Sequence, residues 1–281
     1  MCIRDSKSGG PALLFENVDD YGIPVLINAF GTQQRMAWAL GVENMDELAS
    51  RVKKLLKLSQ GPPSGILNKA RTLMDLVKIA GSQPRLVTSA PCQDVVLTGE
   101  NADLTMLPIL KCWPMDAGRY ITLPLVVSRD PVTGTRNVGT YRMQVYDSKT
   151  AGMHWQTNKV GTHHEREAKE KGLDRLEVAV ALGGDPATVW TGSAPLPPGV
   201  DEFAMSGFIR EKSVDLVKCK TVNLEVPAPL KGILSEINAK DGDVVKVGAV
   251  LGSINENIDK SDEKKIVPEL SLIHISEPTR R

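Results

Sequence analysis

The chain has 281 residues, 41% of them hydrophobic and 24% charged, which is typical of a globular protein with one large or two ordinary domains. Lys plus Arg equals Asp plus Glu at 34 each, so no basic excess exists to bind nucleic acid. No apolar stretch approaches the roughly 20 residues of a membrane helix, and no transmembrane segment is expected. The four cysteines lie far apart without a CxxC pair, which favours a reducing, cytoplasmic setting over a zinc knuckle or a disulfide scaffold.

The two ends of the chain carry no predicted function. Residues 1–8 and 259–281 resemble translated sequencing-adapter DNA, and ordinary disordered tails are the alternative. Both ends are therefore left out of the fold prediction.

Residues 9–92 show the pattern of an N-terminal α/β domain. Strands are predicted at residues 12–16 and 25–28. Asn44 with Glu47 three residues later predicts a capping box, and Leu48 and Val52 begin the apolar face of the helix that follows. A glycine- and proline-rich loop separates this helix from a second apolar stripe at residues 67–77.

From residue 93 to residue 226 the pattern changes to short strands. We predict an antiparallel meander interrupted by one helix, which Thr162 opens as N-cap and Gly172 closes. The predicted strands lie at residues 121–128, 141–146, 152–156 and 175–182. The fold class is therefore α+β: an N-terminal α/β region, then a β-rich domain and a short β-rich C-terminal fragment.

Several motifs follow one another in a fixed order along the chain. They read GGPALLFEN, APCQ, RNVGTYRMQ, GMHWQ, THHERE, VALGGDPA and LPPGVDEF, and lie between residues 9 and 203. In this order they resemble the UbiD family of 3-polyprenyl-4-hydroxybenzoate decarboxylases and their relatives, over residues 9–226. The resemblance implies a split-β-barrel domain at residues 93–226 that binds prenylated FMN, with a divalent metal, usually Mn²⁺, and possibly K⁺.

Three residues match the metal ligands of that family: Asn137, His164 and Glu202. An amide oxygen, an imidazole and a carboxylate together suit Mn²⁺ better than Ca²⁺ or Mg²⁺. Alone, each would be read as a turn or surface residue, and only the ordered motifs favour the ligand role. His163 is the alternative to His164, because neighbours on a helix point about 100° apart and only one can face the site.

The resemblance also assigns residues to the flavin. The residues that match flavin-lining or phosphate-side positions are Thr140, Tyr141, Arg142, His154, Trp155, Gln156, Lys159, Val160 and Ser193. Trp155 can pack in the core, line the flavin, or do both.

Arg142 matches one member of the family's catalytic trio, and its guanidinium offers two parallel donors that suit a substrate carboxylate. A surface salt bridge is the alternative role. Asn137 and Arg142 are five residues apart, so a regular strand would send them to opposite faces. We predict a β-bulge at Gly139 that brings them to one site.

The resemblance stops after residue 226. The Glu-Gly-Pro-x-Gly segment that carries the other two catalytic acids does not follow, and residues 227–258 resemble half a lipoyl domain of a 2-oxo acid dehydrogenase acyltransferase. Thr221 stands where such domains carry the lipoylated lysine. We interpret this change of resemblance as the join of two unrelated genes, with a natural fusion as the alternative.

The predicted function is that of a carboxy-lyase fragment, inactive as it stands, from an enzyme acting on an aromatic or α,β-unsaturated acid such as a 4-hydroxy-3-polyprenylbenzoate in ubiquinone biosynthesis. Its implied partners are that acid and a flavin prenyltransferase as cofactor source, and the parent family is homo-oligomeric. A lipoyl carrier fused to a flavin-binding domain is the alternative from another class, and an inert fragment is a third.

Overall fold

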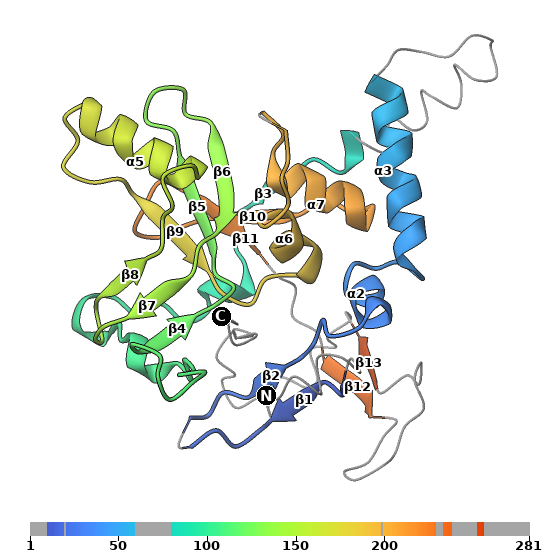
Figure 1. The fold of residues 1–281 in the computed structure, drawn as a ribbon, viewed down its shortest axis with the longest axis horizontal. Helices are drawn as coiled ribbons and strands as arrows, with labels where there is room; N and C mark the ends of the chain where they lie inside the picture. The colour runs from blue at the N-terminus through green and yellow to red at the C-terminus, as the bar shows by residue number, and fades with distance from the viewer. Residues whose placement is uncertain are drawn as a thin grey trace.

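The computed structural model describes residues 10–19, 21–59, 80–197, 199–228, 233–237 and 252–255 (Figure 1). These residues form a mixed α+β fold with several small sheets. No helix among them is long and apolar enough to cross a membrane. The predicted stripe at residues 67–77 lies outside the described residues.

The N-terminal part holds an antiparallel strand pair and two helices. The elements are β1 (Leu13–Phe15), β2 (Val25–Ile27), α2 (Gln33–Ala39) and α3 (Met45–Ser59). At the start of α3, Asn44 Oδ1 accepts the Glu47 N–H at 3.0 Å, as the capping box predicts. The reciprocal bond differs: Glu47 Oε2 accepts the N–H of Glu43 at 3.1 Å, one residue before the cap.

The middle of the chain forms two three-stranded antiparallel sheets instead of one meander. Their strands are β4 (Arg119–Ile121), β5 (Leu125–Arg129), β6 (Arg136–Thr140), β7 (Met143–Val145), β8 (Ala151–Met153) and β9 (Val178–Ala181). The sheets have the orders β4-β7-β8 and β6-β5-β9. The predicted strand at residues 121–128 is wrong as one element, because Pro124 has no N–H for a ladder and the chain changes sheet there.

Helix α5 (Val160–Glu170) packs on β5 and β6. Its N-cap is Lys159, so the prediction that Thr162 caps it is wrong. Thr162 instead donates its hydroxyl to Gln156 O at 2.6 Å, which ties the first turn to the preceding loop. Gly172 ends the helix region with a φ of 73°, as predicted for a left-handed C′ residue.

The C-terminal described part completes the core. It contains α6 (Pro186–Thr191), α7 (Glu202–Arg210), β10 (Asp215–Lys218) and β11 (Glu225–Pro227). Strand β10 pairs antiparallel with β11 and parallel with β3 (Arg85–Val87), and short 3-10 turns lie at Pro91–Gln93, Gly99–Asn101 and Leu104–Met106. Strands β12 (Ile233–Ile237) and β13 (Gly252–Asn255) form a separate antiparallel pair. The lipoyl-like reading of residues 227–258 stays a prediction, because most of them lie outside the described residues.

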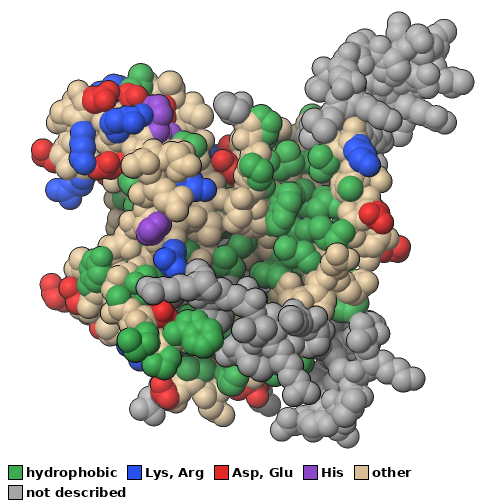
Figure 2. All heavy atoms as spheres, in the orientation of Figure 1, with side chains coloured by type: hydrophobic (Ala, Val, Ile, Leu, Met, Phe, Trp, Pro, Cys, Tyr) green, Lys and Arg blue, Asp and Glu red, His purple; other side chains and the backbone are tan. Residues whose placement is uncertain are grey.

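Two apolar clusters hold these elements together. One joins a face of the β6-β5-β9 sheet to α7 and β10 through Leu125, Val138, Phe203 and Leu216. The other packs α2 and α3 against α6 and α7, and Figure 2 shows hydrophobic side chains gathered over this helical region. Strand β6 is thereby fixed between α5 and α7, with its outer edge facing the start of α7.

Candidate metal and flavin site

The three predicted metal ligands lie on three elements, β6, α5 and α7. Asn137 lies on β6 opposite Ser128 of β5, and the Ser128 hydroxyl lies 3.0 Å from Nδ1 of His164 on α5. Glu202 is the first residue of α7, and its Oε2 accepts the N–H of Val138 at 3.2 Å. Because β6 is an edge strand, this N–H is available to the helix. His164 thus contacts the residue of β5 that lies opposite Asn137, and Glu202 contacts the residue of β6 that follows Asn137.

Burial shifts both titratable groups of the predicted metal set toward their neutral forms. Burial raises the pKa of Glu202 to about 7, against the lowering effect of its hydrogen bond to Val138. Burial also lowers the pKa of His164, which keeps its imidazole neutral. A half-buried carboxyl, a neutral imidazole and the buried Asn137 amide are a donor set that fits Mn²⁺. Within the described ranges, no three His, Cys, Asp or Glu side chains form a metal cluster. The predicted set would not count as such a cluster, because its third member is the amide of Asn137.

The choice between the two adjacent histidines has a structural basis. His164 is 4% exposed, whereas the His163 side chain is 51% exposed and lies 3.7 Å from Glu167. His164 also contacts Ser128 of β5, the residue that pairs with Asn137 across the sheet.

Tyr141 and Trp155 form an aromatic pair beside Asn137, one of the candidate metal ligands. Their rings meet edge to face with centroids 6.0 Å apart, and the Tyr141 hydroxyl accepts the Gly161 N–H at 3.1 Å. Asn137 Nδ2 donates to the same hydroxyl at 3.4 Å. Trp155 Nε1 is buried without a hydrogen-bond partner, so a bound acceptor would satisfy it. The aromatic pair therefore packs against the ligand residues and still offers a polar atom.

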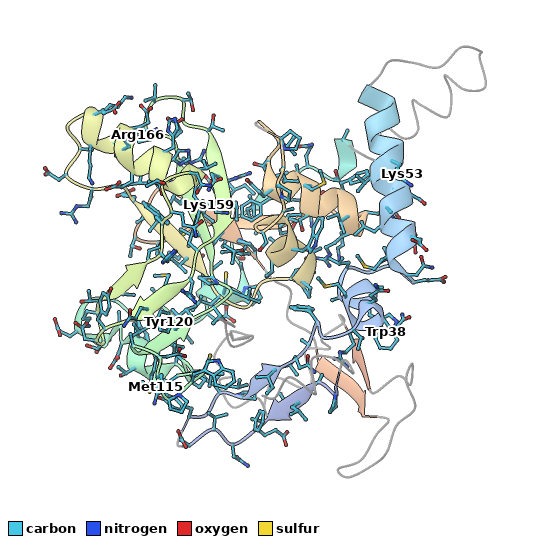
Figure 3. All side chains as sticks on the ribbon, viewed as in Figure 1. Trp38, Lys53, Met115, Tyr120, Lys159 and Arg166 are labelled. Atoms are coloured by element: carbon cyan, nitrogen blue, oxygen red, sulfur yellow. The ribbon has the colours of Figure 1, made fainter. Side chains whose placement is uncertain are left out.

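The remaining predicted cofactor residues follow β6, β7 and β8. Ser193 donates its hydroxyl to Thr140 Oγ1 at 3.1 Å, so two phosphate-side candidates from distant segments touch. The Arg142 guanidinium lies 5.2 Å from the centre of the Tyr120 ring, and the Arg142 carbonyl accepts the His154 N–H at 2.9 Å. Exposed side chains then continue toward α5: Gln156, Lys159 and Val160. Figure 3 shows Lys159 beside α5 and Tyr120 in the sheet below.

The predicted bulge at Gly139 is wrong. Strand β6 pairs with β5 in unbroken register from Arg136 to Thr140, and the chain turns only after Thr140 to enter the other sheet. Gly139 serves a different purpose, since a Cβ there would lie 2.5 Å from the Tyr141 ring. Asn137 and Arg142 thus lie on either side of the change of sheet, and no bulge joins them.

Sequence reasoning missed three residues that contact the predicted site: Ser128, Tyr120 and Arg136. Ser128 and Tyr120 lie on strands without any motif signal of their own, and they meet the site only through pairing. Arg136 stands next to Asn137 in the RNVGTYRMQ motif, and this adjacency was the one signal that could have identified it.

Comparison with known families gives two matches. Residues 85–237 match the 3-octaprenyl-4-hydroxybenzoate carboxy-lyase Rift-related domain of UbiD, and residues 2–55 match the N-terminal domain of the same carboxy-lyase. The first match extends past residue 226, where the predicted resemblance ended, and the second begins within the predicted tail.

Curated relatives and solved structures agree with these matches. An uncharacterized protein of Archaeoglobus fulgidus is 47% identical over 231 residues, which cover 82% of this chain and 47% of the relative. One from Aquifex aeolicus is 46% identical over 220 residues, covering 78% and 44%. The chain thus spans about half the length of the curated relatives it matches.

Among solved structures, the UbiD-class enzyme HmfF of Pelotomaculum thermopropionicum in complex with FMN is 31% identical with a TM-score of 0.63, covering 78% of this chain and 44% of HmfF. The apo 3,4-dihydroxybenzoic acid decarboxylase AroY of Klebsiella pneumoniae is 26% identical with a TM-score of 0.61, covering 78% and 42%.

Proposed function

We propose, since the chain belongs to the UbiD family, that it is the cofactor- and metal-binding part of a carboxy-lyase for an aromatic or α,β-unsaturated carboxylic acid. The observation that supports this proposal is the arrangement around the paired strands β5 and β6. Asn137 contacts Tyr141, His164 contacts Ser128 opposite Asn137, and Glu202 contacts the backbone of the next residue, Val138. One structural neighbour is described in complex with FMN and an evolved form of it with prenylated FMN, which supports the choice of cofactor.

Each group of residues has a proposed task. Asn137, His164 and Glu202 hold Mn²⁺ beside the flavin phosphate, with K⁺ as a second cation. Thr140, Ser193 and Lys159 lie on the phosphate side, and Lys159 adds a point charge. The residues that line the ring are Tyr141, His154, Trp155, Gln156 and Val160. We also assign sheets β4-β7-β8 and β6-β5-β9 to a split-β-barrel domain.

Arg142 is proposed to hold the substrate carboxylate through two parallel N–H donors. Prenylated FMN, when bound, supplies the electron sink for decarboxylation. Protonation of the product carbon needs a general acid, which typically contributes 10²–10⁴-fold, and this chain's motifs do not include the family's acid segment. The chain alone is therefore proposed to bind cofactor with little turnover, in the cytoplasm and with a flavin prenyltransferase as cofactor source.

The test is co-purification of cofactor and metal. We expect the full chain, made in cells that express a flavin prenyltransferase, to carry about one Mn²⁺ per flavin, because a single ion would bridge protein and phosphate. Glu202→Ala should lose both together, and Glu100→Ala, in an exposed turn, should lose neither. Mass spectrometry and metal analysis give the two contents. Undiminished flavin in Glu202→Ala would refute the assignment.

A further inference from the structure

Arg136 links three elements next to the candidate metal site. Its side chain is 14% exposed, and its Nη2 donates to Asp201 Oδ2 at 2.5 Å at the start of α7. Its Nη1 lies 3.5 Å from Glu225 Oε2 on β11, and its guanidinium carbon lies 4.9 Å from the centre of the Phe203 ring. One buried cation thus connects β6, β11 and the first turn of α7.

The residues that Arg136 connects flank the ligands on both sides. Asn137 directly follows Arg136 on β6, while Asp201 and Phe203 directly precede and follow Glu202. The Glu202 carboxylate also accepts the Val138 N–H. The first turn of α7 is therefore held against β6 on either side of Asn137, by the side chain of Arg136 and by the backbone N–H of Val138.

Asp201 transmits this contact to the helix. Its Oδ1 accepts the Ala204 N–H at 3.0 Å and caps α7, while its Oδ2 is the oxygen that Arg136 holds. A carboxylate that is bonded at both oxygens is held in one orientation. The first turn of α7, which this carboxylate caps, is then held in one orientation as well.

We propose that Arg136 is a positioning residue that sets the distance between the metal ligands Asn137 and Glu202. The proposal rests on the metal site proposed above. Residues one contact removed from a metal typically change its affinity 10–100-fold when they are lost, because the ligands lose their fixed geometry.

The direction of the change in Mn²⁺ affinity distinguishes a positional role of Arg136 from a purely electrostatic one. A guanidinium near a divalent cation repels it, so removal of the Arg136 charge alone would tighten metal binding. Loss of position would weaken it. Under the purely electrostatic role, removal of the Asp201 charge alone would weaken Mn²⁺ binding, and removal of both charges would restore it. A positional role predicts weaker binding in all three cases.

The experiment is titration of the full chain with Mn²⁺ in the presence of FMN, with the electron paramagnetic resonance signal of free Mn²⁺ as readout. The variants are Arg136→Met, Asp201→Asn and the double variant. Asparagine remains a good N-cap, so Asp201→Asn removes the ion pair and keeps the capped helix. We expect each single variant to weaken Mn²⁺ binding about tenfold and the double variant to bind no better than either.

Arg129→Met is the matched control, because Arg129 pairs with the same Glu225 but makes no ion pair to α7. It should keep Mn²⁺ affinity within about twofold, as expected for a partly exposed ion pair. Circular dichroism confirms the fold of each variant. If Arg136→Met does not fold, the double variant, which leaves no unpaired Asp201 carboxylate, carries the test.

Two results would overturn the proposal in different ways. If Glu202→Ala abolishes Mn²⁺ binding but Arg136→Met and the double variant bind like the wild type or more tightly, Arg136 acts through charge and does not position the ligands. If Glu202→Ala binds Mn²⁺ like the wild type, the metal site itself is wrong, and the role of Arg136 falls with it.

Discussion

The Ser128 hydroxyl lies 3.0 Å from Nδ1 of His164, and both residues are buried. With Nδ1 engaged, Nε2 is the ring nitrogen left for a metal ion, and Nδ1 then carries the proton and donates to Ser128. This contact holds the direction of the imidazole, and a metal ion at Nε2 would select the tautomer with its proton on Nδ1.

The first prediction is that Ser128→Ala lowers Mn²⁺ affinity about tenfold in the presence of FMN, because the imidazole loses the partner that orients it. Isothermal titration calorimetry gives the affinity. Ser213→Ala, which removes a hydroxyl bonded to Gly81 O away from this site, is the control and should leave the affinity unchanged. An unchanged affinity in Ser128→Ala would show that His164 does not ligate through Nε2.

The contact also shows what the sequence could and could not predict. The ordered motifs correctly predicted the family, and local rules correctly predicted the Asn44 cap and the glycine end of α5, because these signals lie within a few residues of one another. The Ser128–His164 bond joins positions 36 apart and the Arg136–Asp201 pair positions 65 apart. Such pairs depend on strand register and helix packing, which no local pattern encodes.

The wrong predictions have local causes that compete with the pattern. The run of strand-forming residues suggested one strand at residues 121–128, but Pro124 cannot join the ladder and the chain changes sheet there. A free glycine suggested a bulge at Gly139, whereas the glycine makes room for the Tyr141 ring. In both cases one residue's backbone or volume outweighed the periodic signal.

The second prediction concerns that glycine. Gly139→Ala should destabilise the protein by about 1–3 kcal/mol, because its Cβ would lie 2.5 Å from the ring of the buried Tyr141. A displaced ring also loses its bond to the Gly161 N–H, so FMN affinity should fall as well. Urea unfolding gives the stability. Gly81→Ala, with no atom within 4 Å of the added methyl, is the control.

Equal urea midpoints for Gly139→Ala and the wild type would mean that Tyr141 can move without cost. The close approach would then have no part in holding the aromatic pair beside the metal ligands.

The third prediction concerns acid stability. Arg85 donates to both oxygens of Asp215, its cross-strand partner between β3 and β10, and this bond lowers the pKa of Asp215. A carboxylate with a lowered folded-state pKa stabilises the protein above its unfolded pKa of about 3.9, and this stability is lost as the pH falls through the folded value. Asp215→Asn should therefore lower the urea midpoint at pH 7 and show a smaller loss from pH 6 to pH 3. An identical loss in both proteins would contradict this linkage.

The last prediction concerns Arg142, whose guanidinium lies over the Tyr120 ring. Activity needs a positioned flavin, a carboxylate clamp and a proton donor, so the test replaces residues 227–281 with the corresponding half of a related UbiD enzyme. In that enzyme Arg142→Ala should lower the decarboxylation rate on the order of 100-fold or more, because the substrate carboxylate loses its two-donor partner. Arg142→Lys should recover little, since an ammonium is a point charge without the planar fork.

Carbon dioxide release measures the rate, and Arg166→Ala, which removes an exposed arginine of α5, is the control that should keep it. If Arg142→Ala keeps most of the wild-type rate, another residue binds the substrate carboxylate. The unaltered 281-residue chain, loaded with prenylated flavin and Mn²⁺, should turn over far more slowly than the completed enzyme, because it lacks the acid. Equal rates would show that the acid segment is not required and that the proton comes from within the described fold.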